Sequence, residues 1–244
     1  MLLEQQFAWQ GGKARYVRRL FGRIAHVYDL LNRLISFGQD KRWRRFAARL
    51  AALGPDQVGL DIGTGTGDLA IAMLQASAPG CRVIGIDFTR EMLAIGHQKI
   101  ARLGLSDRIE LIQGDANHLP FADNTFDTCC SAFVVRNLPD LQHAFKEMGR
   151  VVKPGGKVVC LELSHPPGLL FSSLYHLYFD RAVPLIGKLI GKALEEYRYL
   201  PQSLALFPTA PQLKAIMEAA GWTSVRYYYL TFGVVAVHIG EKPR

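Results

Sequence analysis

The chain has 244 residues, of which 49% are apolar, so it can bury a full hydrophobic core, and this composition argues against global disorder. It has no run of 18 apolar residues, so a membrane-spanning helix is not expected. Its formal net charge of +8 lies wholly in residues 1–50, where eleven Lys or Arg stand against three acids, while the remaining residues balance 18 against 18.

The first expected elements are helices within residues 13–50. Apolar residues recur there at spacings of three and four, which is the period of one helix face. The residues that begin this pattern are Val17, Leu20, Phe21, Ile24 and Ala25. A further helix is expected over Asp40 to Ala52. We interpret residues 1–53 as a helical lid on the domain formed by residues 54–244.

The basic charge of the N-terminal segment has three interpretations. It could face RNA, an anionic membrane surface, or only water. The segment contains no recognisable RNA-binding motif, so a membrane surface or plain solubility ranks above nucleic acid.

The stretch V-G-L-D-I-G-T-G-T-G-D, residues 58–68, predicts a strand, a glycine loop and the start of a helix. The glycines at 63, 65 and 67 allow a tight turn and the close approach of a ligand to the backbone. The pattern therefore indicates a cradle for a nucleotide-like molecule, although a purely structural turn would also use such glycines.

The charges beside this loop favour one kind of nucleotide. The spacing is G-x-G-x-G, not the G-x-G-x-x-G of dinucleotide sites, and Asp68 stands where the third glycine would fall. Asp61 and Asp68 would repel a pyrophosphate but attract an ammonium group. S-adenosylmethionine carries such an ammonium group, so we expect it as the cofactor.

Two further acids follow expected strands. Asp87 ends the strand expected over Cys81 to Asp87 and suits a ribose diol, although it could instead cap the helix expected over Arg90 to Arg102. Asp115 follows the strand expected over Arg108 to Gln113 and can accept a hydrogen bond from the amine of adenine. Ligands of open α/β sheets bind at this carboxyl edge, so the acids are expected to meet there.

The remaining elements complete an α/β fold. The expected strands and helices are Phe126–Phe133, Asp140–Val151, Lys157–Leu163, Pro208–Gly221, Thr223–Leu230 and Phe232–Gly240. Their alternation indicates a mostly parallel sheet covered on both faces, and the last two strands form an antiparallel hairpin. This is the Rossmann-like, seven-stranded architecture of class I methyltransferases.

The cysteines indicate a reducing compartment. They lie in or beside expected strands with no C-x-x-C pair, and they are Cys81, Cys129, Cys130 and Cys160. Buried, reduced thiols and no metal site are expected. With no signal peptide visible, we expect a cytoplasmic protein, peripheral on the inner face of the membrane if the basic segment binds lipid.

At this point the sequence resembles the ubiquinone/menaquinone biosynthesis C-methyltransferases over about nine-tenths of its length. The shared motifs are F-G-R-I-A-H-V-Y-D-L-L-N (21–32), L-D-I-G-T-G-T-G-D-L (60–69), G-D-A-N-H-L-P-F (114–121), F-V-V-R-N-L-P-D (133–140), L-E-L-S-H-P (161–166), Y-R-Y-L-P-Q-S (197–203) and G-V-V-A-V-H-I-G (233–240). The glycine loop and the acids are common to many methyltransferases. The Y-D-x-x-N, R-N and Y-R-Y-L pieces are more specific.

The resemblance implies a C-methyltransferase that uses S-adenosylmethionine to methylate a prenylated quinol, either demethylmenaquinol or a methoxy-polyprenyl-benzoquinol. Together with the residue pattern, it predicts cofactor contacts at Asp61, Gly63, Thr64, Gly65, Thr66, Asp87, Phe88, Met92, Asp115, Ala116, Ser131 and Ala132. Family members commonly have Ser at the position of Ala132, so that contact is lost or shifted to Ser131. Core packing would explain Met92 equally well.

Methyl transfer to a quinol carbon needs an ionised neighbouring hydroxyl. Arg136, with Asn137 beside it, is the leading candidate to stabilise that phenolate, because arginine stays protonated and cannot itself accept the proton. A structural ion pair is the alternative role for Arg136. His165 and His118 are candidate proton acceptors, and a packing role competes for both.

Substrate contacts are expected from the lid and from the segment before the last helix. The predicted residues are Tyr28, Asn32, Tyr178, Tyr197, Arg198 and Tyr199, with aromatic packing as the alternative for the tyrosines. A helical cap inserted at about 167–200 contains the apolar stretch 169–190. This stretch would either line a tunnel for a prenyl tail or form a buried cap helix without lipid contact.

Two other functions are open at this stage. One is O-methylation of another small aromatic metabolite, and the other is RNA binding by a protein with a methyltransferase fold. The sequence leaves the acceptor ring, the tail length and the oligomeric state undecided, and it is compatible with a homodimer.

Overall fold

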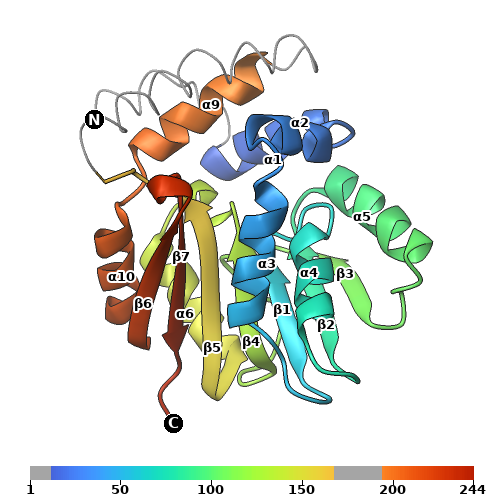
Figure 1. The fold of residues 1–244 in the computed structure, drawn as a ribbon, viewed down its shortest axis with the longest axis vertical. Coiled ribbons are helices and arrows are strands. Elements are labelled where there is room, and N and C mark those ends of the chain that lie inside the picture. Colours follow the sequence, from blue (N-terminus) through green and yellow to red (C-terminus); the bar gives the residue numbers. More distant parts are fainter. Residues whose placement is uncertain (1–11, 168–193) are drawn as a thin grey trace.

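The structure is a computed structural model that describes residues 12–167 and 194–244 (Figure 1). The helices are α1 (Lys13–Ile24), α2 (Tyr28–Ile35), α3 (Asp40–Leu50), α4 (Asp68–Ala76), α5 (Arg90–Arg102), α6 (Leu141–Val151), α9 (Leu194–Ala205) and α10 (Ala210–Ala219), with short 3-10 turns η1 (Val135–Asn137) and η3 (Thr231–Gly233). The strands are β1 (Val58–Ile62), β2 (Arg82–Asp87), β3 (Ile109–Gln113), β4 (Phe126–Ala132), β5 (Val152–Leu163), β6 (Thr223–Leu230) and β7 (Val235–Glu241).

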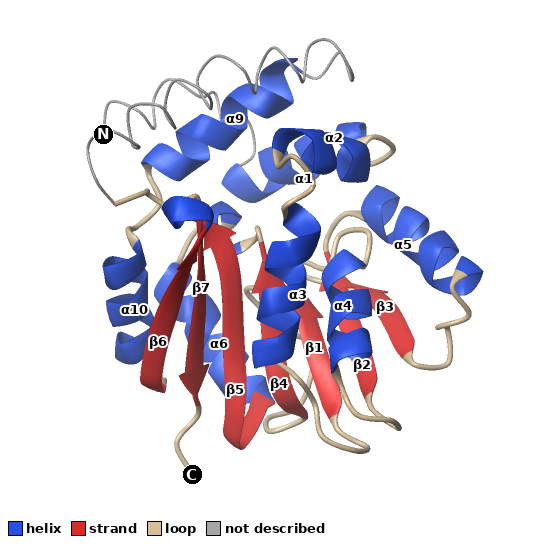
Figure 2. Cartoon of the chain, viewed as in Figure 1, coloured by secondary structure: helices blue, strands red, loops and turns tan. Residues whose placement is uncertain are grey.

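The strands form one seven-stranded sheet in the order β3-β2-β1-β4-β5-β7-β6 (Figure 2). Neighbours among β1 to β5 pair in parallel, whereas β7 pairs antiparallel with both β5 and β6. The sheet order reverses at β1 and β4, and ligand sites of such sheets lie outside the strand ends at this point. The expected fold class is confirmed, including the C-terminal antiparallel hairpin.

Helices cover both faces of the sheet, as Figure 2 shows. On one face α3, α4 and α5 bury an apolar cluster that includes Trp43, Ala47 and Met73. On the other face α6 and α10 bury Phe145 and Trp222, whose indole Nε1 donates to the Phe145 carbonyl at 2.9 Å. These two cores fix the strands rigidly beneath the carboxyl edge.

The N-terminal helices divide between two places. α1, α2 and α9 lie above the carboxyl ends of the strands (Figure 1). α3 instead packs on the sheet beside α4 and buries Ala47 and Ala48 completely. Of the segment 1–53 that we interpreted as a lid, α1 and α2 therefore occupy a lid position, while α3 belongs to a covering layer of the sheet.

The three largest differences from the expected elements each involve three or more residues. The first expected helix is interrupted at 25–27, so α1 and α2 are separate. β5 begins at Val152, five residues early, because Val152 pairs with Phe126 before the chain bulges and resumes pairing at Lys157. β7 begins at Val235, because Thr231 and Phe232 take positive φ angles in the η3 turn.

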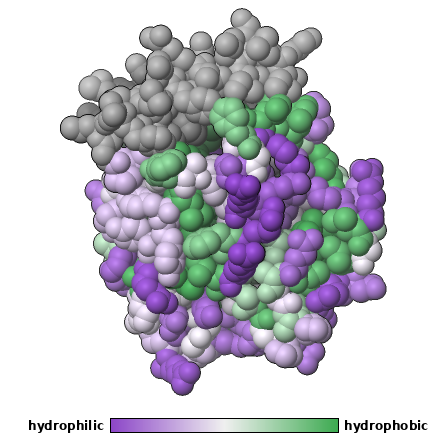
Figure 3. All heavy atoms as spheres, in the orientation of Figure 1, coloured by the Kyte–Doolittle hydropathy of each residue, from purple (hydrophilic) through white to green (hydrophobic). Residues whose placement is uncertain are grey.

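The cysteine prediction is confirmed, since all four thiols are free and buried. Within residues 12–167 and 194–244, no helix combines the length and apolarity needed to cross a membrane. In Figure 3 hydrophilic side chains run down the outer side of α3, and hydrophobic ones gather above it near α2. Leu30, Leu34 and Phe37, in and just after α2, are exposed.

Candidate functional site

The glycine loop between β1 and α4 forms the tight turn that its sequence predicts. Gly63, Gly65 and Gly67 have φ angles of 63°, 55° and 83°, values that side chains disfavour. A Cβ at Gly63 would also lie 2.3 Å from a methyl group of Val134. The loop therefore requires glycine at this position, and its backbone remains open to a ligand.

A cavity of about 470 Å³ lies beside this loop at the carboxyl edge. The predicted cofactor residues that line it are Gly63, Gly65, Asp87, Phe88, Met92, Asp115, Ala116 and Ala132. The predicted acceptor residues Tyr28 and Asn137 line the same cavity. The fold thus brings these residues from five separated segments to one cavity.

Two acids in the cavity differ in exposure. The Asp87 carboxylate is buried and accepts hydrogen bonds from the backbone N–H groups of Gly65 and Thr89, at 2.9 and 2.8 Å. Burial raises the pKa of Asp87 above its ordinary value, although these hydrogen bonds oppose the shift. Asp115 is exposed and accepts from the backbone and side-chain amides of Asn117.

Asp61, Thr64 and Ser131 were predicted as cofactor contacts, but they do not line the cavity. Each is buried, and the Thr64 hydroxyl donates to Asp61 at 2.7 Å. Burial raises the pKa of Asp61 to about 7, with the Thr64 hydrogen bond opposing it. Asp61 and Thr64 therefore join the loop to the end of β1, whereas the Ser131 hydroxyl has no hydrogen-bond partner within the described residues.

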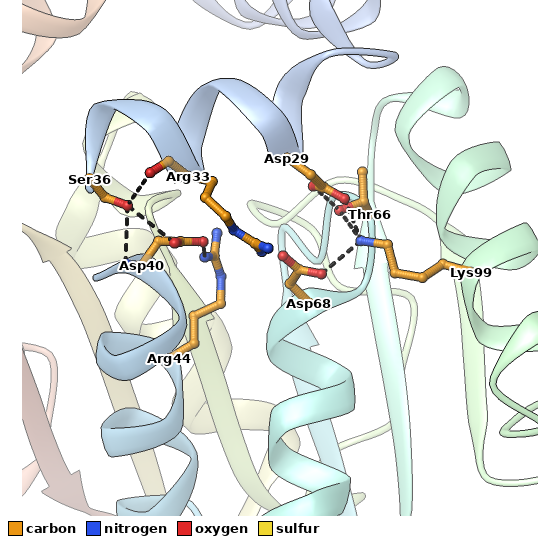
Figure 4. Close-up of polar contacts among 8 residues, drawn as sticks. All are labelled: Asp29, Arg33, Ser36, Asp40, Arg44, Thr66, Asp68 and Lys99. Carbon is orange, nitrogen blue, oxygen red and sulfur yellow. Dashed lines mark hydrogen bonds and ion pairs between the residues drawn. The ribbon is translucent and has the colours of Figure 1, made fainter. Parts of the chain in front are cut away.

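Thr66, another predicted cofactor contact, instead faces α2 (Figure 4). Its hydroxyl donates to Asp29 at 2.7 Å and accepts from Lys99 at 2.9 Å. Lys99 also forms salt bridges with Asp29 at 2.6 Å and with Asp68 at 2.7 Å. This cluster of Asp29, Thr66, Asp68 and Lys99, which we call the lid latch, joins α2 to the glycine loop and to α5.

The lid latch continues toward α3. Burial opposes ionisation of Asp68, but the charges of Arg44 and Lys99 outweigh it and hold the pKa of Asp68 below its ordinary value. Arg44 forms a buried salt bridge with Asp40 at 2.9 Å. Figure 4 shows Arg33 of α2 extending between Arg44 and Asp68. Acidic and basic side chains thus connect α2 to α3 on one side and to α5 on the other.

Arg136 lies in the η1 turn after β4, where the chain reverses through Phe133 at a φ of 61°. Its guanidinium is buried and forms a salt bridge with Glu162 at 2.6 Å. Burial favours the neutral form, yet the charge of Glu162 and its hydrogen bond raise the pKa of Arg136 above its ordinary value. Arg136 does not line the cavity, whereas Asn137 beside it does.

The two histidine candidates lie away from the cavity. The Nε2 atom of His165 is 2.9 Å from the Phe207 carbonyl oxygen, so it donates there in the neutral ring. His118 is exposed, with its ring 5.7 Å from the ring of His143. Neither histidine lines the hollow that the other site residues share.

The predicted substrate residues are only partly described. Tyr28 lines the cavity, and the Asn32 side chain hydrogen-bonds it. The Tyr199 hydroxyl donates to Asn137 at 3.0 Å, and its ring lies 5.8 Å from that of Tyr16. Tyr178 and the apolar stretch 169–190 lie outside the described residues, as do the side chains of Tyr197 and Arg198.

Helix α1 supplies cavity residues that the sequence analysis did not assign. They are Arg15, Val17, Arg18 and Phe21. The Lys13 ammonium at the start of α1 donates to the carbonyls of Arg136 and Leu138, at 3.0 and 3.2 Å. The sequence signal was present in the basic, periodic pattern of α1, but only the fold places this helix over the cavity.

Within the described residues, no cluster of three or more His, Cys, Asp or Glu side chains has an arrangement that could hold a metal ion. The chemistry that the site itself offers is electrostatic. Acids lie at the ends of β2 and β3, an arginine and an asparagine follow β4, and tyrosines come from the lid.

Comparisons with known proteins identify the family of this chain. The sequence model of the ubiE/COQ5 methyltransferase family matches residues 9–242. The demethylmenaquinone methyltransferase of Thermus thermophilus is 48% identical over 92% of the chain and 100% of that relative, and that of Bacillus cytotoxicus is 43% identical over 96% and 98%. A solved SAM-dependent methyltransferase of Thermotoga maritima is 19% identical, with a TM-score of 0.60 over 92% of this chain and 99% of that one, and this likeness shows the fold.

Proposed function

The chain belongs to the ubiE/COQ5 methyltransferase family and is a methyltransferase, and we propose that it transfers a methyl group from S-adenosylmethionine to a ring carbon of demethylmenaquinol. One observation carries the proposal. The match to the demethylmenaquinone methyltransferase of Thermus thermophilus extends over that relative's whole length at 48% identity. It therefore includes the lid and the segment before α10 as well as the common sheet.

The cavity fits S-adenosylmethionine in its chemistry. Asp87 offers a carboxylate to the ribose diol, Asp115 and the backbone of Ala116 suit adenine, and the Gly63–Gly65 backbone suits the methionine part. Asp61 and Asp87 add negative charge close to a cofactor that carries both an ammonium and a sulfonium. When bound, the cofactor supplies an electrophilic methyl group.

The protein's own residues position the acceptor and exclude water. In this proposal Arg136 stabilises the phenolate that activates the ring carbon, and Asn137 orients the ring from the cavity wall. Tyr28 and Tyr199 close the site from the lid side. His165 is poorly placed to accept the proton, because its Nε2 faces a backbone carbonyl.

The proposed reaction can be tested with S-adenosylmethionine that carries a radioactive label in its methyl group. Reduced demethylmenaquinol and a methoxy-polyprenyl-benzoquinol are offered side by side, and the label is located in each product. We expect label on a ring carbon of the naphthoquinol. Label on an oxygen of either product, or no transfer to either quinol, would contradict the proposal.

A prenylated acceptor resides in a membrane, and we propose that the protein reaches it as a cytoplasmic protein bound peripherally to the inner face. The positive charge of residues 1–50 and the exposed Leu30, Leu34 and Phe37 support this. Vesicles with and without anionic lipid provide the test. Sedimentation with anionic vesicles at low salt is expected, and equal recovery in the supernatant with both kinds would refute membrane binding.

A further inference from the structure

Glu162 is a buried carboxylate at the carboxyl end of β5, and it is 1% exposed. A carboxylate in such a place is costly unless charge and hydrogen bonds compensate it. Its strand is held on both sides, by β4 in parallel and by β7 antiparallel, so its backbone position is rigid. The residue is therefore a fixed negative charge beneath the acceptor side of the site.

Both oxygens of Glu162 bind the same turn. Oε1 accepts from Nη1 of Arg136 at 2.6 Å, and Oε2 accepts from the backbone N–H of Arg136 at 3.3 Å. Oε1 also accepts from the backbone N–H of Leu163 at 2.9 Å, which fixes the carboxylate itself. One side chain thus restrains both the backbone and the guanidinium of Arg136.

The rest of the Arg136 guanidinium is only partly hydrogen-bonded. Nη1 donates a second hydrogen bond to the Phe133 carbonyl at 2.8 Å. Nε is buried, and no hydrogen-bond partner for it is found within the described residues. The Tyr199 hydroxyl donates to Asn137, the next residue, and Tyr28 and Tyr199 both lie near enough to influence the pKa of Arg136. Arg136 itself does not line the cavity, so this guanidinium can act on an acceptor oxygen there through its positive charge, from behind the wall that Asn137 forms.

We propose that Glu162 is a positioning residue for methyl transfer, holding Arg136 and the η1 turn so that the guanidinium is fixed toward the acceptor oxygen. The inference rests on the proposed function, since it assigns Arg136 a role in that reaction. Preorganised charge of this kind stabilises a developing oxyanion without reorganisation during the reaction. Glu162 acts only through Arg136, and this dependence can be tested.

The test is a double-mutant cycle with Glu162→Gln, Arg136→Gln and the double variant. We expect each single variant to lower kcat about 100-fold, the loss typical of a small misplacement, with the dissociation constant for S-adenosylmethionine within about twofold of wild type. The double variant should be no slower than Arg136→Gln alone, because Glu162 has nothing left to position. An unchanged kcat for Glu162→Gln, or losses that multiply in the double variant, would overturn the inference.

The inference remains testable if Glu162→Gln fails to fold. Glu162→Gln leaves the arginine charge buried without its partner, whereas the double variant removes both charges and is expected to fold. If Glu162→Gln is not recovered, Glu162→Asp replaces it, because this change keeps the charge and shortens the side chain by one methylene: a lowered kcat supports the inference, and an unchanged kcat refutes it.

A matched carboxylate provides the control. Asp127 also accepts from a cation, Lys153 at 2.8 Å, and from a backbone N–H, that of Val58 at 2.9 Å, but it lies near the start of β4, far from the carboxyl edge. Asp127→Asn should leave kcat unchanged. Wild-type protein without any methyl transfer would refute the proposed function, whereas active wild type with a fully active Glu162→Gln would refute only the role of Glu162.

Discussion

The two halves of the carboxyl edge handle buried charge in opposite ways. In the half formed by the ends of β1, β2 and β3, which we call the cofactor half, Asp61 and Asp87 are buried and form no salt bridge within the described residues, and the pKa of each is raised. In the half formed by the ends of β4 and β5, the acceptor half, Glu162 is paired with Arg136. The buried carboxylates of the cofactor half therefore lack a cationic partner, which a cationic ligand can supply. In the acceptor half, the buried carboxylate of Glu162 already has one in Arg136.

The largest expected effect is in the acceptor half. Arg136→Met leaves Glu162 buried and unpaired, and it should lower the free energy of unfolding by about 4–5 kcal/mol, the upper part of the range for broken buried pairs, because the two side chains are only 5% and 1% exposed. Urea unfolding followed by circular dichroism measures the loss. Lys153→Met breaks a partly exposed pair and should cost less than about 1 kcal/mol. Equal losses in the two variants would remove the distinction between the halves.

The buried carboxylates of the cofactor half should make the free energy of unfolding depend on pH. The pKa of Asp61 is about 7 in the folded protein and near 3.8 when unfolded, so the folded state binds the extra proton between these values. The stability contribution is present below about pH 4 and is lost as pH rises to 7, on the order of 4 kcal/mol in all. Asp61→Asn should flatten this slope in urea unfolding from pH 4 to 8. An unchanged slope in the variant would show that the slope comes from other groups.

Cofactor affinity should depend on Asp87. Asp87→Ala removes a charged acceptor from the cavity wall and should weaken S-adenosylmethionine binding by about 2–3 kcal/mol, measured by calorimetry. Asp107, in the turn before β3, is exposed, and Asp107→Ala should bind as wild type does. If Asp87→Ala keeps full affinity, the carboxylate serves only to accept the N–H groups of Gly65 and Thr89.

The smallest effect is expected from the lid latch, where charges compensate one another at the surface of the cofactor half. Lys99→Met removes both salt bridges and should cost about 1 kcal/mol of stability or less, since the side chains are a quarter to a third exposed. The variant should release S-adenosylmethionine faster, which stopped-flow displacement measures. Lys214→Met, which breaks the exposed pair with Glu218, is the control. Equal release rates would exclude a role of the latch in lid closure.

The cofactor half was also the more predictable half. Its loop is predictable from local sequence, since positive φ angles favour glycine, and Asp87 ends β2 while Asp115 lies two residues after β3. Even there some expected residues do not line the cavity. Thr66 was expected on the cofactor and instead bonds Asp29 of α2, because a hydroxyl in a loop can face either side and the lid supplies the partner.

The acceptor half was predicted only in outline. Arg136 and Asn137 were identified through a family resemblance, but Glu162 was not singled out, because a single acid in an apolar strand has no periodic signature. The contribution of α1 to the cavity was also missed. Lys13 lies 123 residues from Arg136 in the chain, and no local pattern relates the two.

The alternation of strands and helices, the glycine loop and the acids at strand ends were all predictable from the amino-acid sequence, because periodicity and the conformational freedom of glycine are local properties. Tertiary structure decided which distant groups meet. Arg136 finds Glu162 because β4 pairs with β5, and α1 covers the cavity because its apolar face packs on the core beneath it. The charge balance that separates the two halves of the site therefore follows from the strand order of the sheet.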